Sequence, residues 1–197
     1  MKRFSLIFVM TMLLGVGTTS AQSLLFGPGV SYRMADEVEG VHFRTYFALP
    51  KWLSFGPEFT YYIPSSFEGV TDSTLQYYVS ERKLWSADFN FHIDIKIKNA
   101  LTIYPIIGGN LTKLYEVDAV RLETGQLSQD PIDDMFFGLN VGGGIHFVPR
   151  QMGPFVEYKA TLGDLKQQVF TAGFLFRFNL KGDDYEWVDD HEDPRTK

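Results

Sequence analysis

The sequence contains no cysteine, and this absence excludes several classes of protein. Without thiols, the 197-residue chain cannot form disulfide scaffolds, zinc–thiolate sites, iron–sulfur clusters or a cysteine nucleophile. An excess of basic residues is also missing, since 18 Lys and Arg stand against 24 Asp and Glu. The formal charge of −6 argues against a nucleic-acid partner, which normally needs a basic surface.

Long apolar runs are scarce, and the one clear run lies at the N-terminus. Lys2 and Arg3 precede this run, and a stretch of small residues ending at Ala21 follows it. This order predicts a secretory signal peptide over residues 1–21, with cleavage before Gln22. The run is shorter than the ~20 residues that span a bilayer as a helix, which disfavours an uncleaved anchor. No later segment has the ~18 consecutive apolar residues expected of a transmembrane helix.

Aromatic residues, by contrast, are abundant, at 16% of the chain. Many of them alternate with polar residues, most clearly from Trp85 to Ile97, where every odd position is apolar and every even position polar. A period of two predicts a strand with two unlike faces. Similar alternation predicts eight strands, at Leu24–Met34, Val41–Leu49, Leu53–Tyr62, Trp85–Ile97, Leu101–Leu111, Phe137–Phe147, Pro154–Leu162 and Gln168–Leu180.

The lengths of the strands and of their connections indicate a membrane barrel. Tilted strands of about 9–11 residues cross a bilayer. Short turns alternate with longer connections, and segments 63–83 and 115–134 are predicted to be long extracellular loops. We therefore expect an all-β fold, an eight-stranded antiparallel up-and-down transmembrane β-barrel over residues 22–182. The even strand number places both termini on the short-turn, periplasmic side.

A soluble barrel with an apolar interior is the alternative, because alternation alone does not say which face points inwards. The apolar face carries more aromatic and aliphatic side chains than an eight-stranded interior could hold, so we place that face against lipid. In this arrangement Trp52 at the short-turn end, and Tyr61 and Trp85 at the long-loop end, form two aromatic girdles.

Charged side chains fall on the opposite face of the strands, which is therefore the lumen. Their signs are nearly balanced, and buried charges are tolerated when they are paired and hydrogen-bonded. We expect a plugged lumen held by ion pairs, and a narrow polar pore is the alternative. The basic members are Arg33, Arg44, Lys96, Lys159 and Arg177, and the acidic members are Glu58, Asp88, Asp94 and Glu157.

The chain resembles the small outer-membrane β-barrel superfamily. The resemblance rests on the signal peptide, the strand pattern, the loop asymmetry and the last strand with its Phe174-x-Phe176-x-Phe178 pattern. The likeness is to OmpA- and OmpX-type domains and to PorT-like members of the outer membrane protein beta-barrel domain group. It implies insertion into the outer membrane of a Gram-negative bacterium by the barrel-assembly machinery, with membrane lipid as a partner. The three Phe residues would form the insertion signal, although here a tail follows them. The PorT-like likeness suggests a component of transport or secretion assembly.

No residue pattern indicates a metal site, a cofactor or catalysis. His92 and Asp94 form an inward pair, and His146 also faces inwards, but inward polar residues are expected on every strand. Some barrels of the superfamily are lipid-modifying enzymes with a His near the outer rim. His42 lies near that rim, yet no His-x-Ser or Gly-x-Ser-x-Gly arrangement accompanies it. We therefore expect no enzymatic activity, with a lipid-modifying enzyme as a remote alternative.

The last segment, residues 183–197, is strongly acidic, with seven carboxylates against Arg195 and Lys197. We expect a disordered periplasmic tail, or a docking strip for a basic partner that uses Tyr185 and Trp187. Overall, the sequence predicts a monomeric, non-enzymatic barrel with a structural role or a surface-interaction role through its two long loops.

Overall fold

A computed structural model of the chain describes residues 23–49, 52–70, 77–98, 101–121, 128–148 and 151–180. The segments predicted as the signal peptide and the acidic tail lie outside these residues. In the described part of the chain, no helix is long and apolar enough to cross a membrane.

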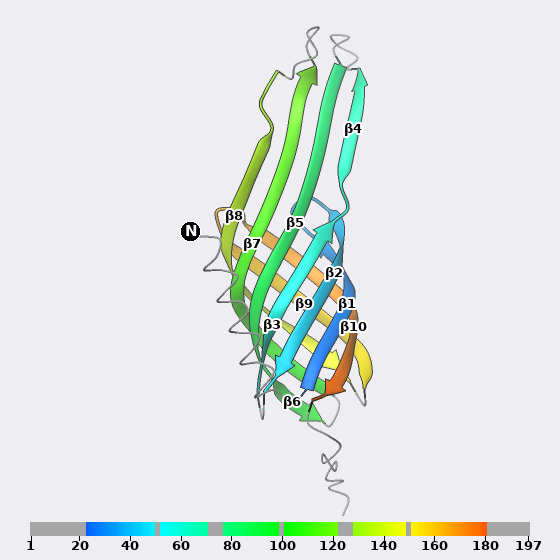
Figure 1. Cartoon of the computed structure of the whole chain (residues 1–197), viewed down its shortest axis with the longest axis vertical. Coiled ribbons are helices and arrows are strands. Elements are labelled where there is room, and N and C mark those ends of the chain that lie inside the picture. The colour runs from blue at the N-terminus through cyan, green and yellow to red at the C-terminus, as the bar shows by residue number, and fades with distance from the viewer. Residues whose placement is uncertain are drawn as a thin grey trace, which may run out of the picture.

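The described residues form one antiparallel sheet that closes on itself (Figure 1). Its neighbour order is β4-β5-β3-β2-β1-β10-β9-β8-β7-β6, and pairing of β5 with β7 joins the two ends into a barrel. The strands are β1 (Ser23–Arg33), β2 (Val38–Ala48), β3 (Leu53–Tyr62), β4 (Ser65–Val70), β5 (Tyr77–Ile93), β6 (Ile95–Lys98), β7 (Leu101–Arg121), β8 (Ile132–Phe147), β9 (Met152–Gly163) and β10 (Gln167–Asn179).

Two of the strands, β4 and β6, are not separate staves of the closed barrel and do not add to its strand number. The short β6 continues β5 beyond Asp94, and β4 pairs with the upper half of β5 while β3 pairs with its lower half. The barrel therefore has eight strands, in agreement with the predicted fold class. All eight predicted segments coincide with barrel strands, although the predicted strand at Trp85–Ile97 is interrupted at Asp94.

Side-chain exposure alternates along the barrel strands, with polar residues inside and apolar residues outside. In β5, for example, Asp88, Asn90 and His92 are buried, whereas Phe91 and Ile93 between and beyond them are exposed. The apolar side chains thus face the surroundings, which excludes the soluble barrel with an apolar interior. Such an exterior is stable against lipid and would be an aggregation surface in water.

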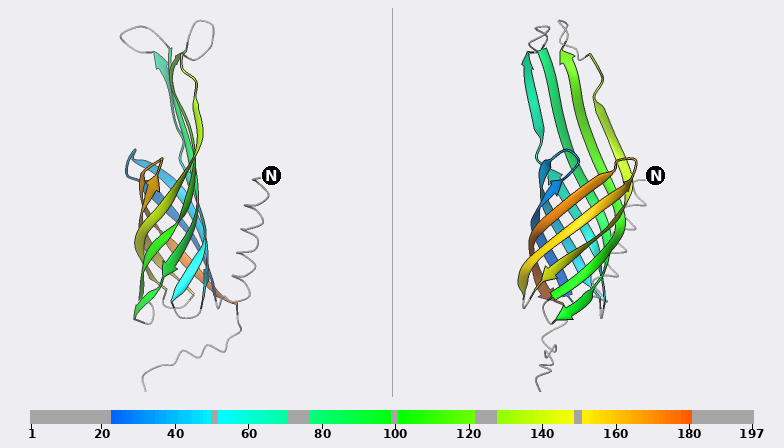
Figure 2. Two further views of the ribbon diagram at one scale, coloured as in Figure 1. Left: turned by 90° about the vertical axis from the view of Figure 1, so that its left-hand side faces the viewer. Right: turned by 180° about the vertical axis from the view of Figure 1, so that it is seen from behind.

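The predicted long loops at 63–83 and 115–134 are wrong as loops, because most of their described residues are strand. β4, the first part of β5, the last part of β7 and the start of β8 continue the sheet beyond the barrel. We call this four-stranded sheet the extension, and define it by β4 and residues 77–83, 115–121 and 132–136. Figures 1 and 2 show it rising above one end of the closed barrel as a single layer.

The length of the strands explains why the extension leaves the barrel. β7 has 21 residues, roughly ten more than the 9–11 that a tilted strand needs to cross a bilayer. At about 3.4 Å per residue, the surplus is on the order of 35 Å of strand. The neighbouring β1, β2, β9 and β10 have 11, 11, 12 and 13 residues, so they end near the barrel rim.

Candidate functional site

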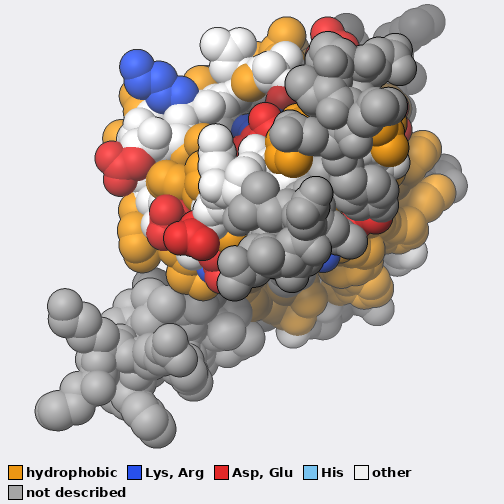
Figure 3. Space-filling view, turned by 90° about the horizontal axis from the view of Figure 1, so that it is seen from above, with side chains coloured by type: hydrophobic (Ala, Val, Ile, Leu, Met, Phe, Trp, Pro, Cys, Tyr) orange, Lys and Arg blue, Asp and Glu red, His pale blue; other side chains and the backbone are white. Residues whose placement is uncertain are grey.

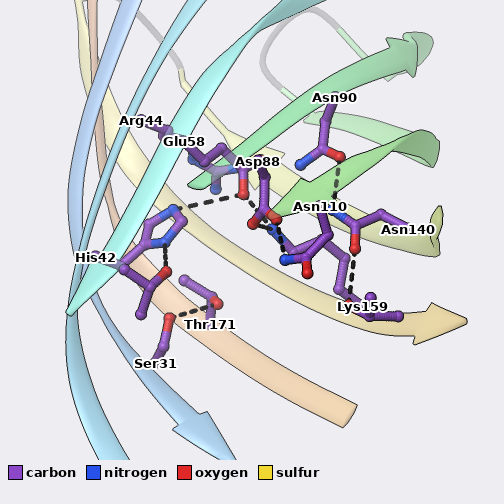
Figure 4. A network of polar contacts seen from close by, with 12 residues as sticks. Ser31, His42, Arg44, Glu58, Asp88, Asn90, Asn110, Asn140, Lys159 and Thr171 are labelled. Carbon is purple, nitrogen blue, oxygen red and sulfur yellow. Dashed lines mark hydrogen bonds and ion pairs between the residues drawn. The ribbon is translucent and has the colours of Figure 1, made fainter. Parts of the chain in front are cut away.

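The middle of the lumen holds a buried ion cluster around Lys159, which projects from β9. Its ammonium group donates to Glu58 of β3 and, at 2.8 Å, to Asp88 Oδ2 of β5 (Figure 4). Asn110 also donates to Asp88, at 2.5 Å. The three charged side chains are at most 6% exposed, so the lumen wall is tied together across several strands by charges that have no access to bulk water.

A second buried pair lies beside this cluster. Arg44 of β2 donates to Glu157 Oε2 of β9 at 2.6 Å, and its guanidinium carbon lies 3.3 Å from the centroid of the Phe155 ring. The Tyr104 hydroxyl donates to the same carboxylate oxygen at 3.3 Å. Arg44 and Glu157 are 113 positions apart in sequence, and they meet because the barrel brings β2 and β9 within reach across its interior.

Neutral polar side chains bond to one another over much of the remaining lumen. Asn and Thr residues dominate, because short polar groups fit a narrow interior and satisfy one another there. These bonds are Asn140–Asn90 at 3.0 Å, Thr161–Asn140, Thr112–Asn110 and Ser31–Thr171 at 2.8 Å, Gln167–Thr112 at 2.7 Å and His42–Thr60 at 2.9 Å.

Apolar clusters lie on either side of the polar layer, one near each end of the lumen. Near the extension, Tyr62, Leu84 and Leu114 pack together, with Val38 and Phe136 against them. At the opposite end, the cluster consists of Leu25, Tyr46, Val148, Phe155 and Leu175. Leu175 is an apolar residue on the otherwise polar face of β10, and its place in this cluster accounts for it. Side chains of the described residues thus occupy the lumen near both of its ends.

The glycine run at 142–144 serves this packing. A Cβ atom on Gly144 would lie 2.6 Å from the Tyr104 ring, well inside contact distance. Tyr104 is 2% exposed and stacks on His92 with ring centroids 4.5 Å apart. Glycine at 144 therefore leaves room for the ring within the lumen.

The nine lumen charges predicted from sequence occupy three kinds of position. Arg44, Glu58, Asp88, Glu157 and Lys159 form the central cluster described above. The others, Arg33, Asp94, Arg177 and Lys96, lie away from it, and Lys96 in β6 is exposed.

Near the extension, Arg33 pairs with Asp36 at 2.8 Å, and Asp36 also pairs with Arg82 at 2.7 Å. This bridge joins the β1–β2 turn to β5. Sequence reasoning missed both partners, because Asp36 lies in a turn and Arg82 in a segment interpreted as a loop. At the other end, Asp94 interacts with Ser54 and with the charges of Lys96 and Arg177.

The three histidines among the described residues, His42, His92 and His146, are also buried within the lumen. His42, the predicted rim histidine, is 0% exposed and bonds to Thr60, so it offers no catalytic group at the surface. His92 lies with Glu58 and Glu157, with one potential ligand atom from each residue within 4.8 Å of the others. The structure therefore groups His92 with these two glutamates rather than with Asp94, its neighbour in the sequence prediction.

On the outer surface, the residues of the predicted girdles lie at opposite ends of the barrel. Trp52 precedes β3 at the end away from the extension and is exposed. Tyr61 is paired with Trp85 across β3 and β5 at the extension end. In β10, Phe174 and Phe178 are exposed and Phe176 is half-buried; their role as an insertion signal stays a prediction.

The extension has a different character from the barrel. Within the described residues, β4 pairs only with β5, and β8 pairs with β9 only from Gly138 onwards. One edge of β4 and one edge of Ile132–Phe137 are therefore unpaired. The extension, as defined above, contains six acidic and three basic residues, a formal charge of −3. From above, acidic side chains are more prominent than basic ones (Figure 3).

Ion pairs in the extension are exposed to water. The ammonium group of Lys83 lies 2.5 Å from Glu81 Oε1, and both side chains are partly or largely exposed. The hydrogen bond to the Glu81 carboxylate raises the pKa of Lys83 above its ordinary value. Exposed ion pairs of this kind add little to stability. Little free energy is therefore lost when charged groups of a partner replace them.

A closed eight-stranded barrel with an apolar exterior and a polar interior defines the fold of small transmembrane β-barrels of outer membranes. Two solved structures illustrate the likeness. The N-terminal β-barrel domain of Pseudomonas aeruginosa OprF has a TM-score of 0.55 at 12% identity, covering 80% of this chain and 98% of that one.

The second structure is Ail, the attachment invasion locus protein of Yersinia pestis, in complex with the heparin analogue sucrose octasulfate. Its TM-score is 0.54 at 16% identity, covering 79% of this chain and 97% of that one. At these identities the likeness concerns the fold. No protein-family model matches the chain, and no curated protein matches it in sequence.

Proposed function

We propose that the protein is a non-enzymatic barrel of a Gram-negative outer membrane that binds a partner at the cell surface through its extension. The observation that carries this proposal is the contrast between a filled lumen and a sheet that projects beyond it with two unpaired edges. In this arrangement both termini are periplasmic and the protein acts as a monomer, with its apolar exterior in membrane lipid after insertion by the assembly machinery.

The packing of the lumen supports a structural role for the barrel. An eight-stranded barrel has an interior that side chains can fill, and here ion pairs and two apolar clusters occupy it. Transport through the barrel would require these groups to separate. Single-channel recording in planar bilayers tests this part: we expect no steady conductance, and stable conductance of the purified monomer would overturn it.

The unpaired edge of β8 supports strand addition as the binding mode. Main-chain groups of an exposed edge can pair with an extended segment of another chain, while side chains on either face select its sequence. Ile132 and Met135 on this edge are 48% and 53% exposed, and Asp133 and Asp134 lie between them. The surface therefore suits an extended segment that alternates basic and apolar residues.

The charge of the extension also argues against a sulfated polysaccharide as the partner. Ail is crystallised with a heparin analogue, a polyanion, whereas the extension of this protein carries an excess of carboxylates. Like charges would repel such a ligand and slow its association. We therefore place the partner among basic proteins or peptides.

Binding of a defined peptide tests the proposal. The probe is a fluorescent peptide of alternating Lys and Val, titrated onto the full protein in lipid nanodiscs and followed by anisotropy. The double variant Asp133→Lys/Asp134→Lys should weaken binding at least about tenfold, because each reversal replaces attraction by repulsion. The matched control is Asp164→Lys, which reverses an exposed acidic residue in the short β9–β10 turn.

Equal binding by the double variant and the wild type would contradict the proposal, as would stronger binding of a heparin fragment than of the peptide. A role in secretion assembly, the function suggested by the PorT-like likeness, predicts a different result. In that case the double variant would impair secretion in cells, and the size of the secretion defect would not correlate with the affinity for the peptide.

A further inference from the structure

The centre of the lumen contains buried polar atoms that have no hydrogen-bond partner in the described structure, although Oε1 of Glu157 lies 3.9 Å from the Lys159 ammonium group. They include Nε2 of His92, Oε1 of Glu58 and Oε1 of Glu157, and each of these residues is at most 3% exposed. A buried polar atom without a hydrogen-bond partner loses its hydration and gains nothing in exchange, so three of them close together call for a common partner.

These three residues converge on one point. A potential ligand atom from each lies within 4.8 Å of the others, although they come from three strands, β3, β5 and β9. The opposite oxygen of each carboxylate is already engaged: Lys159 holds Oε2 of Glu58, and Arg44 holds Oε2 of Glu157. The ion pairs therefore fix the two carboxylates and leave their remaining oxygens directed to other partners.

The charge of this cluster favours a cation over a water molecule. Arg44 and Lys159 supply two positive charges, and Glu58, Asp88 and Glu157 supply three negative ones. With neutral imidazoles, the buried cluster keeps one uncompensated negative charge, which is costly in a low-dielectric interior. A water molecule would satisfy hydrogen bonds and leave the cluster at −1, whereas a divalent cation would bring it to +1 with its charge placed directly against the carboxylate oxygens.

We propose that His92, Glu58 and Glu157 bind a divalent first-row transition-metal ion, such as zinc, inside the barrel. One imidazole nitrogen and two carboxylate oxygens form a donor set that zinc accepts. Ligand atoms about 2.1 Å from a common ion lie roughly 3.4 Å apart, so a small inward movement of the side chains completes the site. The ion would tie three strands together from within. Because the site is enclosed, its role is structural rather than catalytic.

His92 is the best residue for testing this site, because no ion pair of the cluster depends on it. His92→Phe keeps an aromatic ring against Tyr104 and removes the ligand nitrogen. The matched control is His146→Phe, because His146 also faces Tyr104, with ring centroids 5.4 Å apart, but lies outside the triad. His92→Gln serves as a second variant if the Phe variant does not fold, and folding is verified by the heat-modifiable gel shift.

The untagged full chain is refolded into vesicles with zinc, freed of excess metal by gel filtration, and analysed by elemental mass spectrometry. The wild type and His146→Phe should retain one zinc per chain, and His92→Phe should retain at most a tenth as much. Zinc should also slow urea unfolding of the wild type and of His146→Phe, but not of His92→Phe. No retained zinc in the folded wild type, or equal retention in folded His92→Phe, would overturn the site.

Discussion

The barrel and its extension are parts of the same strands, but different forces hold them. In the barrel, each strand has two paired neighbours, a lipid-facing apolar side and a packed interior with paired charges. In the extension, the sheet is a single layer: among the described residues, Ile132–Phe137 has a strand partner on one side only, and the β4 side chains are largely exposed. β5 and β7 therefore run from the barrel, where packing on both faces fixes their structure, into the extension, where their surface is accessible to a partner.

This difference separates the part of the chain that provides stability from the part that contacts partners. Substitutions in the lumen should change unfolding and leave binding intact when the barrel folds. Substitutions in the extension should weaken binding and leave unfolding unchanged. The predictions that follow test this separation.

The largest effect is expected for Lys159→Met, which removes a cation that serves two buried carboxylates. Glu58 and Asp88 would remain in the lumen without their partner, and such a loss typically costs about 3–5 kcal/mol. Urea unfolding in lipid vesicles measures the free energy of unfolding. Lys96→Met is the control, because Lys96 is exposed and its loss should change that free energy by less than about 0.5 kcal/mol. Equal effects of the two substitutions would mean that the lumen cluster is not a stabilising core.

A smaller loss is expected when the lumen is overpacked by one methyl group. Gly144→Ala places a Cβ atom against the buried Tyr104 ring, and overpacking of this kind costs about 1–3 kcal/mol. Gly109→Ala provides the comparison, because a Cβ atom at Gly109 meets nothing within 4 Å. The same unfolding assay applies. If both alanine variants unfold like the wild type, the interior is looser than the contacts indicate.

The smallest effect on stability is expected in the extension. Phe67 of β4 is 61% exposed, with its main ring contact to Tyr78 at a centroid distance of 6.4 Å. Phe67→Ser should change the free energy of unfolding by no more than about 0.5 kcal/mol. A loss as large as that of Gly144→Ala would show that the extension belongs to the stabilising core, and would remove the distinction between the two regions.

The barrel could be predicted from the sequence because its two environments impose a period of two. Trp85–Ile97 shows this most clearly, with lipid on one side and the lumen on the other. The extension was interpreted as loops because only part of it shows this contrast: Val79, Val117 and Ala119 are buried in a cluster of their own, but the contrast does not continue along β4. Residues 65–70, for example, are nearly all exposed, so no apolar period reveals the strand.

The lumen residues could be assigned to a face, but their partners could not be identified. Arg44 and Glu157 come from strands that are not neighbours in the sheet, and only the closure and tilt of the barrel bring them together. The grouping of His92 with Glu58 and Glu157 has the same origin. The sequence spacing suggested Asp94 as the partner of His92, because spacing indicates which residues are neighbours along one strand and not which residues meet across the barrel interior.

Removal of the extension tests the separation of the two regions most directly. Residues 66–81 and 115–133 are each replaced by an Asn-Gly turn, so that the paired positions Ser65 and Arg82, and Leu114 and Asp134, become the ends of short hairpins and most of the proposed binding edge is removed. We predict that this variant keeps the heat-modifiable gel shift and the urea midpoint of the wild type, and loses binding of the Lys–Val peptide. A shortened protein that fails to fold, or one that folds and still binds the peptide, would contradict the account.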